Sequence, residues 1–486
     1  MRRQLVIASL LLVAATLISF APLVNAGITN WDDAVYLESA KAPLSKLLTA
    51  PVMGNYHPLT MVSLAIEERL FGIRARELHA TNLLLHLAGS LCVLLLLFEM
   101  TGSPFGALAG ALFFAVHPLR VESVGWIAER KDVLCELFFA AALLAYLRHI
   151  RRGAHFGWVF ALFVLALLAK ATAVVFPIVT LLIDFLERRR PRMGRTAVLL
   201  AISLTFGLVA VYAQRGPGAL TTLPGFAFTP VTKTLLACRA LAMEIAREII
   251  PANLSAFYPY PKSIGLVDVM CAAAVLVLVV AVAAAAFRWR PIFFGSAFFL
   301  LTIAPTLPLL SIGQTMAADR YTLLPSIGLA YLVATGIVKM RRSTAVVVVI
   351  AGTILLSVAT QRRCAVWHDS VSLWTSVIDY DDSIALAYNS RAVALLAAGD
   401  ARGARIDLDR ALALDRCYGA ALRNRALLAG RAGDLDAGDR DLQRAIACDP
   451  HDALAWQMRC SLLMHAGRVD DARRCAAAAP LTRSVR

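Results

Sequence analysis

The sequence predicts an all-α protein in which a polytopic membrane helix bundle precedes a soluble helical-repeat domain. Of its 486 residues, 59% are hydrophobic and 17% are charged, and the mean hydropathy is +0.68. Such values exclude an ordinary soluble enzyme. Several apolar runs of about 20 residues, long enough to cross a bilayer, lie between residues 4 and 360. From residue 362 onward, eighteen arginines without lysine accompany sixteen aspartates without glutamate, which leaves a net charge of only +2.

We expect eleven spans in a membrane domain of residues 1–361. The first is the apolar run from Leu5 to Leu23. It also resembles a signal peptide, because Val24-Asn25-Ala26 is a small-residue cleavage pattern, and whether residues 1–26 are removed stays open. The other ten are expected at 80–99, 105–116, 133–147, 156–169, 172–186, 196–213, 267–287, 292–310, 322–338 and 344–360.

Basic clusters define the expected topology, because Lys and Arg are enriched in cytoplasmic loops. With eleven spans, the clusters at 148–152, 187–195, 288–290 and 339–342 all lie on the cytoplasmic side, and Arg362 and Arg363 are the exception. Residues 231–250 carry Lys233, Glu244, Arg247 and Glu248 on one helical face, so we expect an amphipathic helix on the outer surface there. The protein is then expected in the inner membrane of the cell with its tail in the periplasm.

Most of the net charge of +15 belongs to these clusters beside apolar runs, so membrane lipid is an expected partner and nucleic acid is not. The nine cysteines are odd in number and contain no CxxC motif. We interpret them as packing residues, with neither a zinc site nor a disulfide framework.

The tail, residues 362–486, repeats with a period of 34. Gly399-Asp400, Gly433-Asp434 and Gly467-Arg468 mark equivalent turns, and Tyr388, Leu422 and Trp456 mark equivalent large apolar positions. This pattern resembles the tetratricopeptide repeat, in which paired helices stack into a solenoid with a concave groove. We expect a half-repeat at 370–384 and repeats at 385–418, 419–452 and 453–486. The residues after the large positions, Asn389, Arg423 and Gln457, are predicted to line the groove. The groove would then bind a ligand, or else it is filled by the protein's own outer loops.

The polar motifs of the membrane domain gather in outer loops expected at 25–79, 117–132, 214–266 and 311–321. They include Trp31-Asp32-Asp33, Tyr56-His57-Pro58-Leu59-Thr60, the stretch from His117 to Leu134, Pro251-Ala252-Asn253-Leu254 and Asp319-Arg320-Tyr321. Charges this close to hydrocarbon are costly, so their clustering predicts a functional site.

In this order and with the repeat tail, the motifs resemble bacterial relatives of the transmembrane and tetratricopeptide-repeat O-mannosyltransferases, which are multi-span glycosyltransferases of the C-type fold. The resemblance implies transfer of a sugar, with mannose as one candidate, from a polyprenyl-phosphate donor. The acceptor would be a hydroxyl group of a protein or glycan on the outer face, and the reaction would invert the anomeric centre. Eukaryotic members carry Arg in place of His57, so fold and reaction class transfer more directly than sugar or acceptor.

The resemblance implies that the acidic pair Asp32 and Asp33 engages the acceptor. A carboxylate that accepts the hydroxyl proton during attack contributes roughly 10² to 10⁴ in rate. Because consecutive side chains diverge, we expect one base and one supporting carboxylate, and which is which stays open. The structural alternative is that one of them caps a short helix.

The phosphate leaving group requires cations, and Arg130, Lys131, Lys170 and Arg320 are the candidates. The alternatives are interfacial snorkelling and, for Arg130 and Lys131, local ion pairs with Glu129 and Asp132. His57, His117, Glu122 and Asp319 are candidate supporting residues. A divalent cation held by Glu122 with Asp32 or Asp33 stays open, because no ligand spacing establishes it.

A different class of function is a transporter, or a non-catalytic membrane scaffold whose repeats recruit a partner protein. A transporter is expected to place ionisable residues near mid-membrane and to show internal symmetry. Here the polar motifs lie at span ends, and no repeat relates the two halves of the membrane domain. The sequence therefore favours the transferase.

Overall fold

The computed structural model describes residues 2–214, 229–309 and 315–480. Over these ranges it is all-α, and its extended pairings are two isolated bridges, Val52 with Asn55 and Tyr258 with Ala317. The chain forms two compact units, Met1–His368 and Asp369–Arg486. The expected loops 214–266 and 311–321 and the last expected repeat fall partly outside the described residues, at 215–228, 310–314 and 481–486.

Each expected span coincides with an apolar helical segment of the first unit. Six of these segments are long and apolar enough to cross a bilayer, and they contain α1 (Arg2–Phe20), α5 (Ala75–Thr101), α8 (Arg130–Arg152), α11 (Met193–Ala213), α13 (Leu266–Arg288) and α16 (Arg342–Val366). The shorter ones contain α6 (Pro104–Ala115), α9 (Phe156–Ala169), α10 (Phe176–Leu186), α14 (Arg290–Ile303) and α15 (Ser326–Val338). Several apolar helices are therefore established, and eleven crossings stay a prediction.

The core of the first unit depends on close helix packing and on aromatic contacts. A Cβ on Gly106 or Gly110 of α6 would collide with the Ala334 or Ala330 carbonyl oxygen of α15. Small residues let helix backbones approach in this way, which matters where lipid supplies no hydrophobic drive between helices. Phe176 of α10 stacks on Phe163 of α9, with 4.8 Å between ring centroids.

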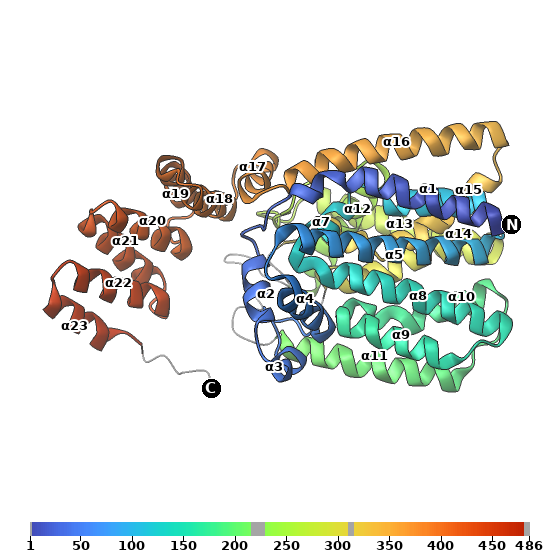
Figure 1. The fold of residues 1–486 in the computed structure, drawn as a ribbon, viewed down its shortest axis with the longest axis horizontal. Coiled ribbons are helices and arrows are strands. Elements are labelled where there is room, and N and C mark those ends of the chain that lie inside the picture. Colours follow the sequence, from blue (N-terminus) through green and yellow to red (C-terminus); the bar gives the residue numbers. More distant parts are fainter. Residues whose placement is uncertain (1, 215–228, 310–314, 481–486) are drawn as a thin grey trace. The chain divides into compact units, whose positions relative to one another are not determined.

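Short helices lie at one end of this bundle, as Figure 1 shows for α2 (Asp33–Ala40), α3 (Leu44–Thr49) and α4 (Pro58–Phe71). α4 begins where the sequence predicts it, since Pro58 occupies its first turn and His57 its N-cap. α7 (Arg120–Gly125) follows His117-Pro118-Leu119, with Leu119 as its N-cap. Loops and short helices thus bring the sequence motifs to the ends of the apolar helices.

The amphipathic helix expected at 231–250 exists as α12 (Pro230–Ile249), but most of its charged face is not exposed to solvent. Glu244, Arg247 and Glu248 are buried inside the protein, with exposed fractions of 1%, 7% and 3%. The charged face of α12 is therefore turned toward neighbouring elements. Amphipathic periodicity identifies a two-faced helix, but it does not show which face meets the protein when buried partners neutralise the charges.

The first unit extends past the expected boundary at residue 361. α16 continues to Val366, and Trp367 packs on Trp126 with 5.7 Å between ring centroids. The backbone N–H of Gly27 donates to the His368 carbonyl oxygen at 2.7 Å. Residues 362–368, assigned to the tail by composition, therefore belong to the membrane unit because a helix and its contacts ignore a shift in composition.

The second unit consists of α17 (Ser370–Tyr380) and three helical hairpins. These are α18 (Ala385–Ala397) with α19 (Ala401–Leu414), α20 (Gly419–Arg431) with α21 (Leu435–Cys448), and α22 (Ala453–His465) with α23 (Val469–Ala478). Gly399, Gly433 and Gly467, the predicted turn residues, have φ of 87°, 82° and 72°. An L side chain rarely adopts this conformation, so glycine fits the turn inside each hairpin.

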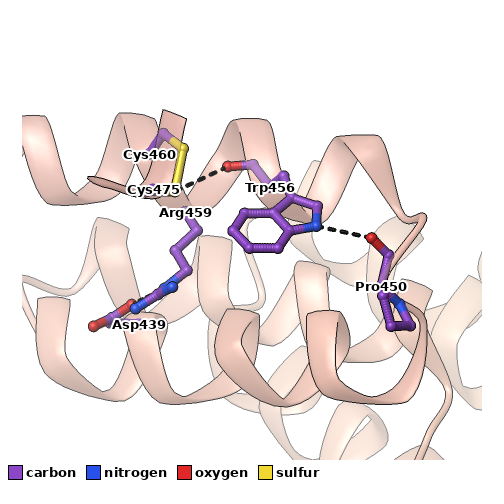
Figure 2. Close-up of a disulfide and its surroundings, with 6 residues drawn as sticks. All are labelled: Asp439, Pro450, Trp456, Arg459, Cys460 and Cys475. Carbon is purple, nitrogen blue, oxygen red and sulfur yellow. Dashed lines mark hydrogen bonds and ion pairs between the residues drawn. A yellow bond between two sulfur atoms is a disulfide. The ribbon is translucent and has the colours of Figure 1, made fainter. Parts of the chain in front are cut away.

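The interpretation of all nine cysteines as packing residues was wrong for four of them. Cys417 is bonded to Cys448, and Cys460 is bonded to Cys475, with Cα–Cα separations of 5.6 Å and 5.5 Å. Figure 2 shows the second disulfide, which joins the two helices of the last hairpin beside Trp456. Spacings of 31 and 15 residues match no short motif, so only the return of the chain in a hairpin brings these thiols together.

Candidate active site

A cavity of about 290 Å³ lies at the end of the bundle that carries the short helices. Its charged lining residues come from four separate segments: Asp32, then Glu129 and Lys131, then Lys170, then Arg320. Tyr36 and Tyr321 also line it. Acidic and basic side chains share this cavity. Charged residues from three of the sequence motifs, together with Lys170, therefore converge on one space. The cavity lining does not include His57, His117, Glu122, Asp319 or the 251–254 motif.

The two adjacent carboxylates, Asp32 and Asp33, have different surroundings. Asp33 is buried and accepts hydrogen bonds from the Thr29 N–H at 3.0 Å, the Thr29 hydroxyl at 2.8 Å and the Ala128 N–H at 2.8 Å. Asp32 instead lines the cavity. It occupies the N-cap of α2, but within the described residues its side chain makes no capping hydrogen bond. The geometry thus separates a structural carboxylate, Asp33, from a cavity-facing one, Asp32.

Burial makes both carboxylates more basic than usual. It raises the pKa of Asp33 to about 6, against the opposing effect of its hydrogen bonds from Thr29 and Ala128. Burial also raises the pKa of Asp32, where the nearby cations Lys131 and Arg320 oppose it. A carboxylate with a raised pKa is a better proton acceptor near neutral pH.

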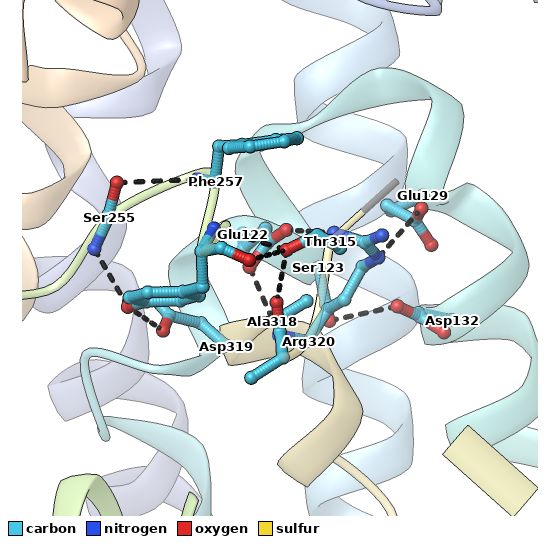
Figure 3. Close-up of polar contacts among 12 residues, drawn as sticks. Glu122, Ser123, Glu129, Asp132, Ser255, Phe257, Thr315, Ala318, Asp319 and Arg320 are labelled. Carbon is cyan, nitrogen blue, oxygen red and sulfur yellow. Dashed lines mark hydrogen bonds and ion pairs between the residues drawn. The ribbon is translucent and has the colours of Figure 1, made fainter. Parts of the chain in front are cut away.

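Three cations meet at Glu129 on the cavity wall. Its carboxylate lies 2.9 Å from Lys131 Nζ, 3.6 Å from Lys170 Nζ and 3.3 Å from Arg320 Nε. Figure 3 shows Arg320 between Glu129 and Glu122. Sequence reasoning identified the three cations but treated Glu129 only as a local ion-pair partner. It was underestimated because its contacts with Lys170 and Arg320 join residues that are far apart in the chain.

Aromatic rings and further carboxylates hold these cations in place. Lys131 Nζ lies 4.8 Å from the centroid of the Tyr36 ring, and the Arg320 guanidinium carbon lies 5.2 Å from that of Trp126. Lys170 is paired with Asp132, and Arg320 with Glu122. The cations are therefore positioned before any ligand arrives, with their charges balanced by carboxylates.

Arg130 lies apart from the other three candidate phosphate ligands. Its buried side chain pairs with Glu67 and donates to Asn82 Oδ1 at 2.8 Å and to the Leu78 carbonyl oxygen at 2.9 Å. Lys131 and Arg130 diverge because consecutive residues at the start of a helix point in different directions. Arg130 thus joins α4, α5 and α8 and does not line the cavity.

The hypothesis of a metal site at Glu122 finds no ligand set. Glu122 accepts a hydrogen bond from the Arg320 N–H at 3.1 Å and pairs with the Arg320 side chain. Of the two expected co-ligands, Asp32 and Asp33, the second already receives three hydrogen bonds. Across residues 2–214, 229–309 and 315–480, no group of three or more His, Cys, Asp or Glu side chains is arranged to hold a metal ion.

The two candidate histidines occupy different layers. His57 stacks on Tyr36 with ring centroids 5.3 Å apart, so it supports the cavity wall from behind. His117 lies deeper, 4.0 Å from the Glu248 carboxylate. Burial lowers the pKa of His57 to about 3 and that of His117 to about 4, so both rings are neutral at physiological pH.

A second buried network, behind the cavity, holds the segment that contains Arg320. Asp319 accepts a hydrogen bond from the Tyr258 hydroxyl at 2.7 Å and pairs with Arg363 at 3.2 Å. The Ser255 N–H in turn donates to the Tyr258 hydroxyl, and Figure 3 shows Ser255 and Asp319 on the two sides of these contacts. The Ala318 N–H donates to Glu244 at 3.0 Å. Sequence reasoning missed Tyr258, Glu244 and Arg363 as site residues because their partners come from distant helices.

Glu248 of α12 extends this network to Thr322, on the C-terminal side of Arg320. It pairs with Arg120 of α7 at 2.6 Å, and Arg120 also donates to the Thr322 hydroxyl at 2.8 Å. Arg247 lies over the Tyr258 ring, 3.5 Å from its centroid. The charged face of α12 therefore fixes the loop segments on both sides of Arg320.

The three residues predicted to line the repeat groove differ in exposure. Asn389 is buried and accepts a hydrogen bond from the Asn424 side chain at 2.8 Å. Arg423 is half-buried and paired with Asp452, while Gln457 is exposed. An equivalent sequence position thus serves packing between hairpins at one site and faces solvent at another.

Comparison with known proteins gives partial sequence relatives. No protein-family model matches the chain. Over 103 residues it is 36% identical to protein O-mannosyl-transferase TMTC1 of Mus musculus, a match that covers 20% of this chain and 11% of that relative. Protein O-mannosyl-transferase TMTC4 of Mus musculus is 36% identical over 118 residues, with coverages of 21% and 16%. Protein O-mannosyl-transferase Tmtc1 of Drosophila melanogaster is 30% identical over 123 residues, with coverages of 25% and 14%.

The chain thus spans at most 16% of the length of these three relatives. Over that segment the expected resemblance to the O-mannosyltransferases is confirmed. Among solved structures, ArnT from Cupriavidus metallidurans bound to undecaprenyl phosphate aligns with 89% of this chain and 79% of its own, at 16% identity and a TM-score of 0.39. The apo state of the same protein aligns at 15% identity and a TM-score of 0.41.

Proposed function

We propose that this protein is a membrane glycosyltransferase that transfers one sugar from a polyprenyl-phosphate carrier to a hydroxyl acceptor. The observation that carries the proposal is the cavity in which Asp32 lies beside the Lys131, Lys170 and Arg320 cluster. A carboxylate suits activation of a hydroxyl group, and a cation cluster suits a phosphate leaving group. Both parts of the reaction then have a chemical partner in one space.

In the proposed reaction, the acceptor oxygen attacks the anomeric carbon while Asp32 takes the hydroxyl proton. The bond between the anomeric carbon and the phosphate oxygen breaks, and its electron pair leaves with the polyprenyl phosphate. Lys131, Lys170 and Arg320 stabilise the charge that develops on that phosphate. Attack from the face opposite the leaving group inverts the anomeric centre. Each step uses residues that line the cavity, so no metal ion is invoked.

The phosphate competes with Glu129 for the three cations. Because the cations already converge on one carboxylate, an incoming phosphate finds them pre-positioned. Arg320 offers a planar fork for two phosphate oxygens, whereas the lysines act as point charges. This arrangement supports a role for all three cations in donor binding, and it assigns Arg130 to structure.

The sugar and acceptor are proposed from the partial relatives. Their names describe protein O-mannosyl transfer, so we propose mannose as the sugar and a serine or threonine hydroxyl of a protein as the acceptor. The three hairpins of the second unit, with a turn glycine every 34 residues, support a tetratricopeptide-type solenoid that binds the acceptor. Of the three residues predicted to line its groove, Arg423 and Gln457 are more accessible than Asn389.

Two features support an extracytoplasmic location of the cavity and tail. Four basic clusters fall on one side if all eleven expected spans cross the membrane. The disulfides Cys417–Cys448 and Cys460–Cys475 are typical of oxidising compartments such as the bacterial periplasm. Both features favour an active site on the outer face of the inner membrane.

The test is sugar transfer in proteoliposomes that contain polyprenyl-phosphate mannose and a serine- and threonine-containing acceptor peptide. We expect Asp32→Asn to lower transfer by about 10² to 10⁴-fold while donor binding persists. Lys170→Gln is expected to weaken donor binding instead. Glu38→Gln is the matched control, because Glu38 is an exposed carboxylate on the same helix. Full transfer by Asp32→Asn would remove the assignment of Asp32, and no transfer with any polyprenyl-phosphate sugar would remove the proposed reaction.

A further inference from the structure

A second charged cavity, of about 250 Å³, lies at the opposite end of α8 from the proposed active site. Lys131 lines the first cavity, and His149 lines the second. These residues are separated by 18 positions of one helix, or about 27 Å at the α-helical rise. That distance is close to the thickness of the hydrocarbon core, so the two cavities belong to opposite membrane faces.

Four arginines line this second cavity: Arg189, Arg190, Arg192 and Arg195. The acidic residue among its lining is Asp184, which is buried and accepts a hydrogen bond from the Tyr146 hydroxyl at 2.8 Å. Against four guanidinium groups, one carboxylate leaves a strong positive excess. Such an excess favours the binding of an anion from outside the protein.

Neighbouring arginines at the same end of the bundle show the contrast. Arg151 pairs with Glu187 at 2.7 Å, Arg152 pairs with Glu99 at 2.8 Å, and Arg148 also contacts Glu99. Within residues 2–214, 229–309 and 315–480, none of the four cavity arginines has a carboxylate within ion-pair distance. The arginines at the end of α8 are therefore paired with carboxylates, whereas the arginines of the cavity are not.

The Arg189 backbone and the Arg195 side chain are held by local contacts. Arg188 has a φ of 54°, and the Arg189 N–H donates to the Asp184 carbonyl oxygen at 2.9 Å, which reverses the chain after α10. The Arg195 guanidinium carbon lies 5.1 Å from the centroid of the Phe156 ring, and the group also contacts His149. Arg195 is thus fixed on an aromatic platform beside the loop arginines.

Apolar side chains form part of the cavity wall, at Ile150, Phe156 and Leu199, and Tyr146, His149 and Thr196 also line it. A ligand that fits this wall has an anionic group for the arginines and a hydrocarbon part for the apolar surface. Guanidinium forks match the oxygens of a phosphate group. Basic pockets between membrane helices, close to the bilayer surface, bind lipid head groups by this chemistry.

We propose that this cavity binds the phosphate group of an anionic phospholipid, on the membrane face opposite the proposed active site. The lipid phosphate contacts the arginines of the 189–195 segment, and its acyl chains lie along the apolar helices. This lipid site is separate from the donor cavity, and its existence does not depend on the proposed sugar transfer.

The test is native mass spectrometry of the full-length protein in detergent, with equal amounts of dioleoyl phosphatidylglycerol and dioleoyl phosphatidylcholine. We expect wild-type protein to retain phosphatidylglycerol with a preference of about tenfold or more. Arg192→Gln with Arg195→Gln is expected to lose that preference. Arg195 also packs on Phe156. A second variant, Arg189→Gln with Arg190→Gln, therefore replaces only exposed arginines and leaves this packing intact. It tests the same loss of lipid preference.

The matched control is Arg288→Gln with Arg341→Gln, which removes two exposed arginines of other basic loops outside this cavity. It is expected to retain the wild-type preference. The proposed site would be overturned if wild-type protein retained both lipids equally. It would also be overturned if the control variant lost the lipid preference as fully as the cavity variants. Displacement of the retained lipid by millimolar inorganic phosphate would overturn the lipid assignment in favour of a soluble phosphate ligand.

Discussion

Arg363 and Asp319 form a buried ion pair, with 3.2 Å between Nη2 and Oδ2, that joins the end of α16 to the segment carrying Arg320. Arg363 also donates to the Leu254 carbonyl oxygen at 3.0 Å. Its charge is thus neutralised inside the protein. In the expected topology Arg363 follows the outer end of the last span, where basic residues are disfavoured. The ion pair with Asp319 compensates its charge there.

Breaking this pair is expected to destabilise the membrane unit. Arg363→Gln leaves the Asp319 carboxylate buried without its cation, at a cost of about 3 kcal/mol or more. The double variant Arg363→Gln with Asp319→Asn should recover part of the loss, and thermal unfolding of the purified protein measures both. Arg362→Gln is the control, since Arg362 is the exposed neighbour. Equal melting temperatures for the Arg362 and Arg363 variants would contradict the coupling.

Substitutions of Asp32 and Asp33 should differ in their effect on the free energy of unfolding. Asp33→Asn replaces one of two accepting oxygens with an amide that faces a donor, either at Thr29 or at Ala128. We expect it to lower the free energy of unfolding by about 1–3 kcal/mol. Asp32→Asn should leave the free energy of unfolding near the wild-type value, because Asp32 faces the cavity. Denaturant unfolding distinguishes the two, and a stable Asp33→Asn protein would argue against its structural role.

Stability should depend on pH through Glu122. Burial raises the pKa of Glu122 in the folded protein to about 7 despite the nearby Arg320, from an ordinary value of 4.5. Between these two values the folded protein holds a proton that the unfolded chain has released. The contribution of Glu122 to stability is therefore full at acidic pH and is lost as pH rises toward 7.

Glu122→Gln removes this titration, so its melting temperature should vary less with pH than that of wild type between about pH 5 and 7. Glu38→Gln, which alters an exposed carboxylate, should keep the wild-type profile. Melting curves at several pH values measure the difference. Parallel profiles for the wild-type and Glu122→Gln proteins would show that Glu122 has an ordinary pKa.

Thiol accessibility should reveal the two disulfides of the second unit. Cys92, Cys135, Cys238, Cys271 and Cys364 are free. Denatured protein should therefore take up five alkyl groups without reductant and nine with it, as counted by intact mass. Cys417→Ser with Cys448→Ser is expected to lower stability by about 2–4 kcal/mol. Nine alkyl groups without reductant would mean that all the cysteines are reduced in the isolated protein.

Membrane orientation can be tested with fusions to a reporter that is active only in the periplasm. A fusion after Ser372 should be active, and a fusion after Arg190 should be silent, because the basic clusters and the disulfides support the same orientation. A cytoplasmic reporter at the same two positions serves as the control and should give the opposite pattern. The reverse result would place the tail in the cytoplasm.

Much of this protein follows from periodicity in its sequence. Apolar runs predict the helices around the first unit's core, and a period of 34 predicts the hairpin turns at Gly399, Gly433 and Gly467, because a left-handed turn favours glycine wherever it recurs. The motif-based reasoning also identified Asp32, Lys131, Lys170 and Arg320 as candidates. These features depend on neighbouring residues or on repeated local constraints, which a single sequence contains.

Only the tertiary structure decided how those residues divide into cavity and scaffold. Asp32 and Asp33 are adjacent, yet Asp33 is occupied by Thr29 and Ala128 while Asp32 faces the cavity. The inward charged face of α12 and the disulfides likewise arise between segments that lie far apart in the chain. Burial and hydrogen bonding depend on which segments meet in space, because a buried charge persists only where a partner compensates its lost hydration.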